Sequence, residues 1–180
     1  MKKFKYILIS SIIIFGISFP SHFLFDIFQN DIIAALFPAN ESIFQHMKMV
    51  FSCFFIFYLG LWILRKRFNY HNLFLVNIVS VLSCITIFLI IYIPVYLRFG
   101  EHMIFTLILL FITILFGQYI GSLLIGKKDI KWYDTISIIC LFIIFIINGY
   151  LTYNPINNFI FWDPEHETYE IVSKEQKNKN

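Results

Sequence analysis

The sequence predicts an all-α integral membrane protein: a bundle of five transmembrane helices with a short interfacial or re-entrant segment before the second span. The chain of 180 residues is 59% hydrophobic and only 14% charged, whereas soluble domains carry about 25% charged residues. Apolar runs of about 20 residues, long enough to cross the hydrocarbon core of a bilayer, recur along the chain. We expect one transmembrane domain over residues 1–172 and a polar, disordered tail over 173–180.

The apolar runs and the polar residues between them set the limits of the spans. The expected spans are 5–27, 41–64, 72–97, 103–125 and 132–152. The first has a basic start but no small-x-small cleavage site, so it is expected to be an uncleaved span rather than a signal peptide. Residues 32–37 are too few to span and end at Pro38, which predicts the interfacial or re-entrant segment. Gly117 and Gly121 form a small-xxx-small pattern, which lets helix backbones approach closely.

Lys and Arg residues predict the orientation in the membrane. The amino terminus, the 65–67 loop and the 127–131 loop each carry three, whereas the loops on the other side carry only Arg98. The positive-inside rule therefore places the amino terminus in the cytoplasm and the carboxyl terminus outside. A composition rich in Ile, Phe, Asn and Lys is typical of AT-rich bacterial genomes, so the expected location is a bacterial cytoplasmic membrane.

This orientation places four of the five histidines at or near the outer side, although the histidines were not used to derive it. They are His22, His46, His102 and His166. Most of the acidic residues fall on the same side. The net charge of +3 is not a nucleic-acid signal, because the basic residues lie in loops between spans. The expected partner is the lipid bilayer, with a lipid or membrane-anchored molecule as a candidate substrate; the oligomeric state is left open.

The segment 40–48 is the densest run of polar chemistry next to an apolar span. Asn40 is a good helix N-cap, and Glu41 follows where the helix dipole favours an acid. A helix from 41 to about 64 would carry a polar stripe on one face, with a second polar row beside it. The stripe contains Glu41, Gln45, Lys48 and Ser52, and the second row contains Ser42 and His46.

Three interpretations of this segment remain open, and the first is a metal site. Imidazole and carboxylate are ligands that zinc prefers, and a catalytic site needs three of them and an open position for water. No paired-ligand motif is present. Glu41 and His46 are five residues apart, about 140° around a helix, so they are expected to be poor partners on one metal. The candidate metal ligands are His22, His46, His102 and His166.

The second interpretation is metal-free acid–base chemistry, in which Glu41 acts at the membrane boundary and a neighbouring histidine moves protons. Ser42 and His46, one turn apart, would be a candidate nucleophile pair. The third is purely structural, with Lys48 paired to Glu41 or to another acid. Intramembrane ionisable groups usually mark functional sites, so Lys48 stays a candidate.

The segment 163–166 is a second candidate. It is either a solvated turn after an aromatic stretch, or part of a tail that folds back and brings Asp163 or His166 to the 40–48 segment. The expected catalytic candidates are therefore Glu41, His46, Lys48 and Asp163, and the expected binding residues are His22, Asn40, Ser42, Gln45 and His102.

The run Asn40–Lys48 resembles the signature of a family of small bacterial integral membrane proteins without an assigned activity: N-E-S, an aromatic residue, then x-H-x-K. His22, the Ala-Leu-Phe stretch at 35–37 and the Phe-Trp-Asp-Pro segment at 161–164 match further motifs of that family. Gln45 stands where the family usually has Glu, and Glu167 and Glu170 stand where it has glycines. The resemblance supports the choice of site but implies no reaction.

Two classes of function follow. One is a membrane-embedded hydrolase or transferase that acts at an outward-facing polar pocket, with a divalent metal such as zinc as a candidate cofactor. The alternative is a non-enzymatic membrane protein that binds a small ligand or partner, or that supports a transport or resistance system.

Overall fold

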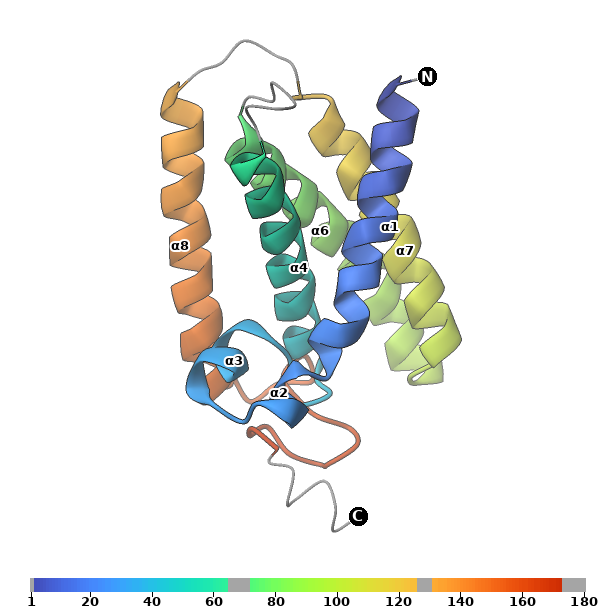
Figure 1. Ribbon diagram of the computed structural model, residues 1–180. Helices are drawn as coiled ribbons and strands as arrows, with labels where there is room; N and C mark the ends of the chain where they lie inside the picture. The colour runs from blue at the N-terminus through green and yellow to red at the C-terminus, as the bar shows by residue number, and fades with distance from the viewer. Residues whose placement is uncertain (1, 65–71, 126–130, 173–180) are drawn as a thin grey trace. The chain divides into compact units, whose positions relative to one another are not determined.

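The structure is a computed structural model that describes residues 2–64, 72–125 and 131–172, and the regular structure within them is helical (Figure 1). The helices are α1 (Lys2–His22), α2 (Leu24–Ile27), α3 (Asp31–Leu36), α4 (Ile43–Ile63), α6 (Leu73–Phe99), α7 (Met103–Ser122) and α8 (Lys131–Tyr153). In this part of the chain, five helices are long and apolar enough to cross a membrane, which confirms the predicted fold class. The basic loops at 65–67 and 127–130 and the tail at 173–180 lie outside the described residues.

The helix ends differ from the predicted spans by a few residues, for local reasons. Helix α1 includes Pro20 and ends at His22, after which the amide of Phe23 donates to the Pro20 carbonyl at 3.2 Å. Helix α4 begins at Ile43 rather than at 41, because the Ser42 hydroxyl accepts a hydrogen bond from the Gln45 amide at 3.4 Å. Ser42 therefore occupies the N-cap position predicted for Asn40.

The chain divides into two compact units that interleave along the sequence, and each is described by itself. Unit 1 comprises residues 1–16 and 54–138, and unit 2 comprises residues 17–53 and 139–180. The single domain over residues 1–172 stays a prediction.

In unit 1, α6 and α7 pack closely through glycine. A methyl group added to Gly117 would meet the carbonyl oxygen of Ser80 and the side chain of Cys84, and one added to Gly121 would meet the Ser80 hydroxyl. The close approach predicted from the small-xxx-small pattern is confirmed. Buried polar side chains from α4, α6 and α7 bond here as well: the Tyr58 hydroxyl lies 3.0 Å from Gln118 Oε1 and 3.2 Å from Ser80 Oγ.

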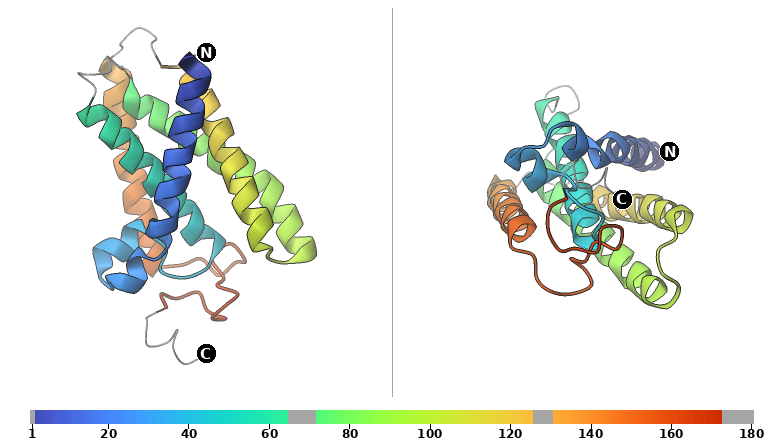
Figure 2. Two further views of the ribbon diagram at one scale, coloured as in Figure 1. Left: turned by 45° about the vertical axis from the view of Figure 1, so that its right-hand side comes forward. Right: turned by 90° about the horizontal axis from the view of Figure 1, so that it is seen from below.

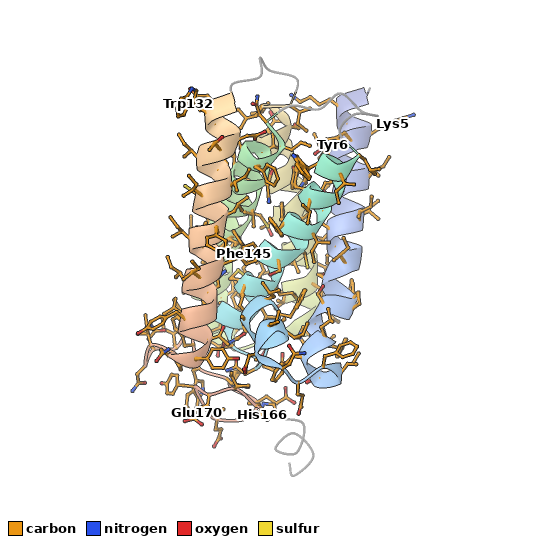
Figure 3. All side chains as sticks on the ribbon, turned by 60° about the vertical axis from the view of Figure 1, so that its left-hand side comes forward. Lys5, Tyr6, Trp132, Phe145, His166 and Glu170 are labelled. Atoms are coloured by element: carbon orange, nitrogen blue, oxygen red, sulfur yellow. The ribbon has the colours of Figure 1, made fainter. Side chains whose placement is uncertain are left out.

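In unit 2, α2, α3 and the C-terminal segment (residues 154–172) lie together beside the end of α8 (Figure 2). Figure 3 labels His166 and Glu170 in the C-terminal segment, and Phe145 in α8, about two turns before the end of that helix. The ring of Phe145 packs edge-on against Phe51 of α4, with centroids 5.0 Å apart. A methyl group added to Gly149 of α8 would lie in ordinary contact with Ala35, so α3 packs closely on α8.

Helix α3 lies alongside α4 well inside the predicted span. The Ser52 hydroxyl donates to the Leu36 carbonyl at 2.6 Å, and the Lys48 ammonium donates to the Ala34 carbonyl, also at 2.6 Å. Ser52 is nine residues beyond the first residue of α4, or about 14 Å along its axis at 1.5 Å per residue. The end of α3 therefore lies about 14 Å along α4, and the choice between a re-entrant and an interfacial segment stays a prediction.

Candidate functional site

Three side chains of unit 2 meet in the part of the chain where the sequence predicted a cluster of histidines and acids. His22 is the last residue of α1, and His46 lies in the first turn of α4. Glu41 lies in the bend immediately before Ser42, the cap of α4. The three side chains are each about one quarter exposed, at 27%, 26% and 21%. A partly exposed cluster at helix ends is accessible to a ligand and is also shielded on its inner side.

The three ligand atoms form a nearly equilateral triangle. His22 Nε2 lies 3.1 Å from His46 Nε2 and 3.3 Å from Glu41 Oε2, and His46 Nε2 lies 3.4 Å from the same oxygen. A tetrahedral zinc ion with bonds of about 2.0–2.1 Å holds its ligand atoms about 3.3–3.4 Å apart. The triangle therefore has the dimensions of one face of a zinc coordination tetrahedron, with the fourth position left for water.

The hydrogen bond of His46 on its other nitrogen fixes the tautomer of the ring. His46 Nδ1 lies 2.9 Å from the backbone carbonyl of Ser42, and a carbonyl oxygen can only accept. Nδ1 therefore carries a proton, and in the neutral ring Nε2 directs its lone pair at Glu41 and His22. A backbone partner on the non-ligating nitrogen is the usual arrangement at metal-binding histidines.

The expectation that Glu41 and His46 are poor partners on one metal is wrong. It assumed that both residues lie on one regular helix, where five residues separate side chains by about 140°. Because α4 begins at Ile43, Glu41 precedes the helix, and its carboxylate turns back towards the first-turn histidine. Asn40 supports this bend, since its Oδ1 accepts from the Ser42 amide at 3.1 Å.

The C-terminal segment is bonded to this bend. The Asp163 carboxylate is fully buried and accepts from the Glu41 amide at 3.1 Å. The same oxygen lies 3.0 Å from His166 Nδ1, while the other oxygen accepts the amides of Glu165 and His166 at 2.9 and 3.1 Å. Asp163 thus holds the peptide of Glu41 and orients the His166 ring, so that Nε2 of a neutral His166 is a base.

Further bonds attach the C-terminal segment on either side of Asp163. The rings of Phe44 and Phe161 stack with centroids 4.5 Å apart, and the Phe44 amide donates to the Ile160 carbonyl at 2.9 Å. The Asn40 side chain donates to the Glu170 carbonyl at 2.9 Å. The tail therefore folds back onto segment 40–48, which was one of the two alternatives predicted for it.

The rest of the predicted polar stripe bonds to the chain segment that precedes it. Gln45 Oε1 accepts from the Ala39 amide at 3.2 Å. Lys48 is 2% exposed and donates to the Ala34 carbonyl and, at 2.9 Å, to the Thr152 hydroxyl of α8. The cation and Ser52 satisfy carbonyl groups at the end of α3, which have no partner within that helix. These bonds support the structural interpretation for Gln45 and Lys48, and a role of Lys48 in chemistry stays a prediction.

Other candidates lie elsewhere. His102 belongs to unit 1, where it precedes α7 with an exposed side chain, and its carbonyl accepts from the Thr106 amide and hydroxyl. His166 pairs with Asp163. Among the described residues, the group of possible metal ligands consists of His22, Glu41 and His46.

Sequence reasoning missed two residues that shape this part of unit 2. Thr152 is the α8 partner of Lys48, and nothing in the local sequence distinguishes it from the other polar residues of that span, such as Ser137 and Asn148. Asn30 caps α3, with its Oδ1 accepting from the Ile33 amide at 3.0 Å. Asn followed by Asp is a recognisable helix start.

The fold and the site together define a polytopic α-helical membrane protein with a clustered histidine–glutamate–histidine triad next to a buried Asp–His pair. The chain belongs to the family of unknown function DUF6512, which it matches over residues 1–171. No curated protein and no solved structure matches the chain.

Proposed function

We propose that this protein is a membrane-embedded, metal-dependent hydrolase that acts on a lipid or membrane-anchored substrate. The observation that carries the proposal is the triangle of His22 Nε2, His46 Nε2 and Glu41 Oε2, with sides of 3.1–3.4 Å. Two neutral nitrogens and one carboxylate oxygen form a ligand set of the kind found at catalytic zinc centres. A divalent metal, with zinc as first choice, is the proposed cofactor.

Charge favours a cation at the centre of this triangle. The Ser42 carbonyl holds the proton of His46 on Nδ1, so the neutral ring presents a lone pair to the Glu41 carboxylate at 3.4 Å. Two lone pairs at that distance repel each other unless a cation or a donated proton lies between them. A proton on His22 Nε2, or a second proton on His46, would also relieve the repulsion; this is the non-enzymatic alternative, and metal binding distinguishes it from the metal site.

The proposed reaction needs few further groups. A metal at the triangle would lower the pKa of a bound water and polarise the substrate oxygen. The Asp163–His166 pair is joined to Glu41 through a single peptide group, and we assign to it the positioning of Glu41 and the transfer of protons. We further propose, from the distribution of Lys and Arg alone, that this end of unit 2 faces outwards from a bacterial cytoplasmic membrane.

The test is hydrolysis by the purified full-length chain in lipid nanodiscs, with and without a chelator. Glu41→Gln replaces one ligand oxygen by an amide of the same shape, and Glu165→Gln is the matched control, because the Glu165 side chain is exposed. We expect hydrolysis of acyl lipids that chelation and Glu41→Gln abolish and that Glu165→Gln leaves intact. Hydrolysis that survives both chelation and Glu41→Gln would refute the proposal.

A further inference from the structure

Charge is distributed very unevenly at the end of unit 2 that carries the triad. In the described residues of this unit, 17–53 and 139–172, there are seven acidic residues but only one Lys or Arg. The acids are Asp26, Asp31, Glu41, Asp163, Glu165, Glu167 and Glu170. The single cation, Lys48, is 2% exposed and bonded to Ala34 and Thr152, so it is directed into the unit.

The acidic residues of the unit fall in two stretches of the chain, 26–41 and 163–170, and the other described residues of the unit contain none. Asp26 lies on α2, one turn beyond His22, and Asp31 begins α3, where it accepts from the Tyr153 hydroxyl at 2.9 Å. The other acids of the C-terminal segment lie on the chain that Asp163 and Asn40 bond to the Glu41 bend. Within the described residues of the unit, seven carboxylates, one ammonium and one divalent metal ion leave an excess of four negative charges; residues 173–180, which lie outside the described part, carry three lysines and one glutamate.

Enzymes that transfer or cleave phosphoryl groups surround the phosphate with Arg, Lys or several metal ions. The described residues of unit 2 offer no exposed Lys or Arg for this purpose. An acyl carbonyl is uncharged, so its hydrolysis needs no cationic side chain around it; a metal ion held by the triad would polarise the carbonyl and activate a water. The charge distribution therefore disfavours phosphodiester cleavage and favours acyl chemistry.

Exposed apolar side chains follow the ligand His22 along the chain, in α2 and at the start of α3. They are Phe23, Ile27, Phe28 and Ile32, which are 55–73% exposed. The Phe23 ring is 5.1 Å from the ring of the ligand His22. In a membrane protein such side chains contact lipid, so an acyl chain lying along residues 23–32 would bring its carbonyl end to the triad.

We propose that the substrate is an acyl ester or acyl amide with a long chain and a head group that carries no negative charge. This inference rests on the hydrolase proposed above and adds the selectivity. Water adds its oxygen to the acyl carbon, and the bond from that carbon to the alcohol oxygen or amine nitrogen breaks. The leaving atom takes one proton of that water, and the second proton leaves when the carboxylic acid ionises: it passes to solvent for an ester and to the released amine for an amide. The carboxylate product is then repelled by the acidic surface, which assists its release.

The test compares three substrates with the same decanoyl chain: decanoylglycerol, decanoylcholine and decanoylglycerol phosphate. Full-length, zinc-loaded protein in phosphatidylcholine nanodiscs is assayed for released decanoate. We expect kcat/KM for the neutral and cationic substrates to exceed that for the phosphate by at least about tenfold at low salt, with a smaller ratio at high salt because exposed charges are screened. Equal or faster cleavage of the phosphate would overturn the selectivity.

A charge variant and a binding measurement separate the two proposals. A triple variant removes three exposed acids outside the triad: Glu165→Gln, Glu167→Gln and Glu170→Gln. In this variant the ratio of kcat/KM for the uncharged substrate to that for the phosphate should fall towards one, and an unchanged ratio contradicts the inference. With Co²⁺ in the site, a neutral decanoyl hydroxamate should change the visible spectrum more than a sulfonated analogue of equal length. That result without any hydrolysis would retain the selectivity and refute the hydrolase. Equal changes would refute the selectivity, and no Co²⁺ binding would refute both.

Discussion

Asp163→Asn should release the C-terminal segment from the Glu41 bend without unfolding the helices. The carboxylate is fully buried and accepts four hydrogen bonds, two on each oxygen. Asparagine has the same shape but only one accepting oxygen. Whichever way its amide turns, an NH₂ group faces two donors: either the Glu41 amide and the His166 ring, or two backbone amides of the segment.

The magnitude follows from the bonds that are lost. A hydrogen bond to a charged group contributes about 1.5–3 kcal/mol, so two lost bonds cost about 3–6 kcal/mol of local stability. Since about 1.4 kcal/mol is a factor of ten, local opening of the C-terminal segment should become at least about 100-fold more frequent. Zinc affinity should fall about 10- to 100-fold, the usual effect of losing a group that orients a metal ligand.

Hydrogen exchange read by mass spectrometry measures this directly, with peptides from residues 158–172 compared with peptides from α6. Glu165→Gln is the matched control, because Asp163 bonds the backbone of Glu165 rather than its side chain. Exchange should accelerate over 158–172 and at the amides of Glu41 and Phe44, which bond this segment, but not over α6, and only in Asp163→Asn. Unchanged exchange there, or acceleration spread equally over α6, would refute the reasoning.

Three further predictions concern the units and the triad. Lys48→Met removes the donor to the Ala34 carbonyl. Hydrogen exchange over α3 should therefore accelerate by an amount equivalent to about 1–3 kcal/mol, while zinc stays bound. Loss of hydrolysis with unchanged exchange in α3 would instead give Lys48 a part in the chemistry. Gly121→Leu should lower the melting temperature of the protein in detergent, because the new side chain would clash with Ser80. Gly60→Leu should not, because no atom lies within 4 Å of a methyl group added there. Equal effects of the two substitutions would contradict the close packing of α6 on α7. Because imidazole binds metal only as the neutral base, protons compete with zinc for the two histidines. Zinc affinity measured by competition with a chelator dye should therefore fall as the pH is lowered, and affinity independent of pH would exclude two histidine ligands.

The five spans were predictable from sequence because hydrophobic length is a local property, and the structure reproduces them within a few residues. The small-xxx-small packing of Gly117 and Gly121 was predictable for the same reason. The distribution of Lys and Arg predicted an orientation that places four of the five histidines on one side of the membrane. Two of these, His22 and His46, meet in the triad.

The partners of the polar stripe could not be predicted from periodicity. A helical pattern shows that Gln45, Lys48 and Ser52 share a face, but not that this face binds backbone groups of residues 34–39. The contact between Glu41 and His46 was excluded by treating 41 as helical, an error of two residues at a helix end. Helix ends depend on caps such as Ser42, so angular arguments fail first there.

The contacts of the C-terminal segment were beyond sequence reasoning for a different reason. Asp163 and Glu41 are 122 positions apart, and nothing local at either residue specifies the other. The sequence could offer only the choice between a solvated turn and a segment folded back onto 40–48.

The most direct test of the central claim is the zinc content of purified, full-length protein, measured by mass spectrometry of the metal. His22→Ala and His46→Ala each remove one ligand of the triad, and His102→Ala is the matched control in unit 1. We expect one zinc ion per chain in the wild-type protein and in His102→Ala, and almost none in His22→Ala or His46→Ala. Wild-type protein without zinc after incubation with it, or zinc retained when either His22 or His46 is replaced, would contradict the account.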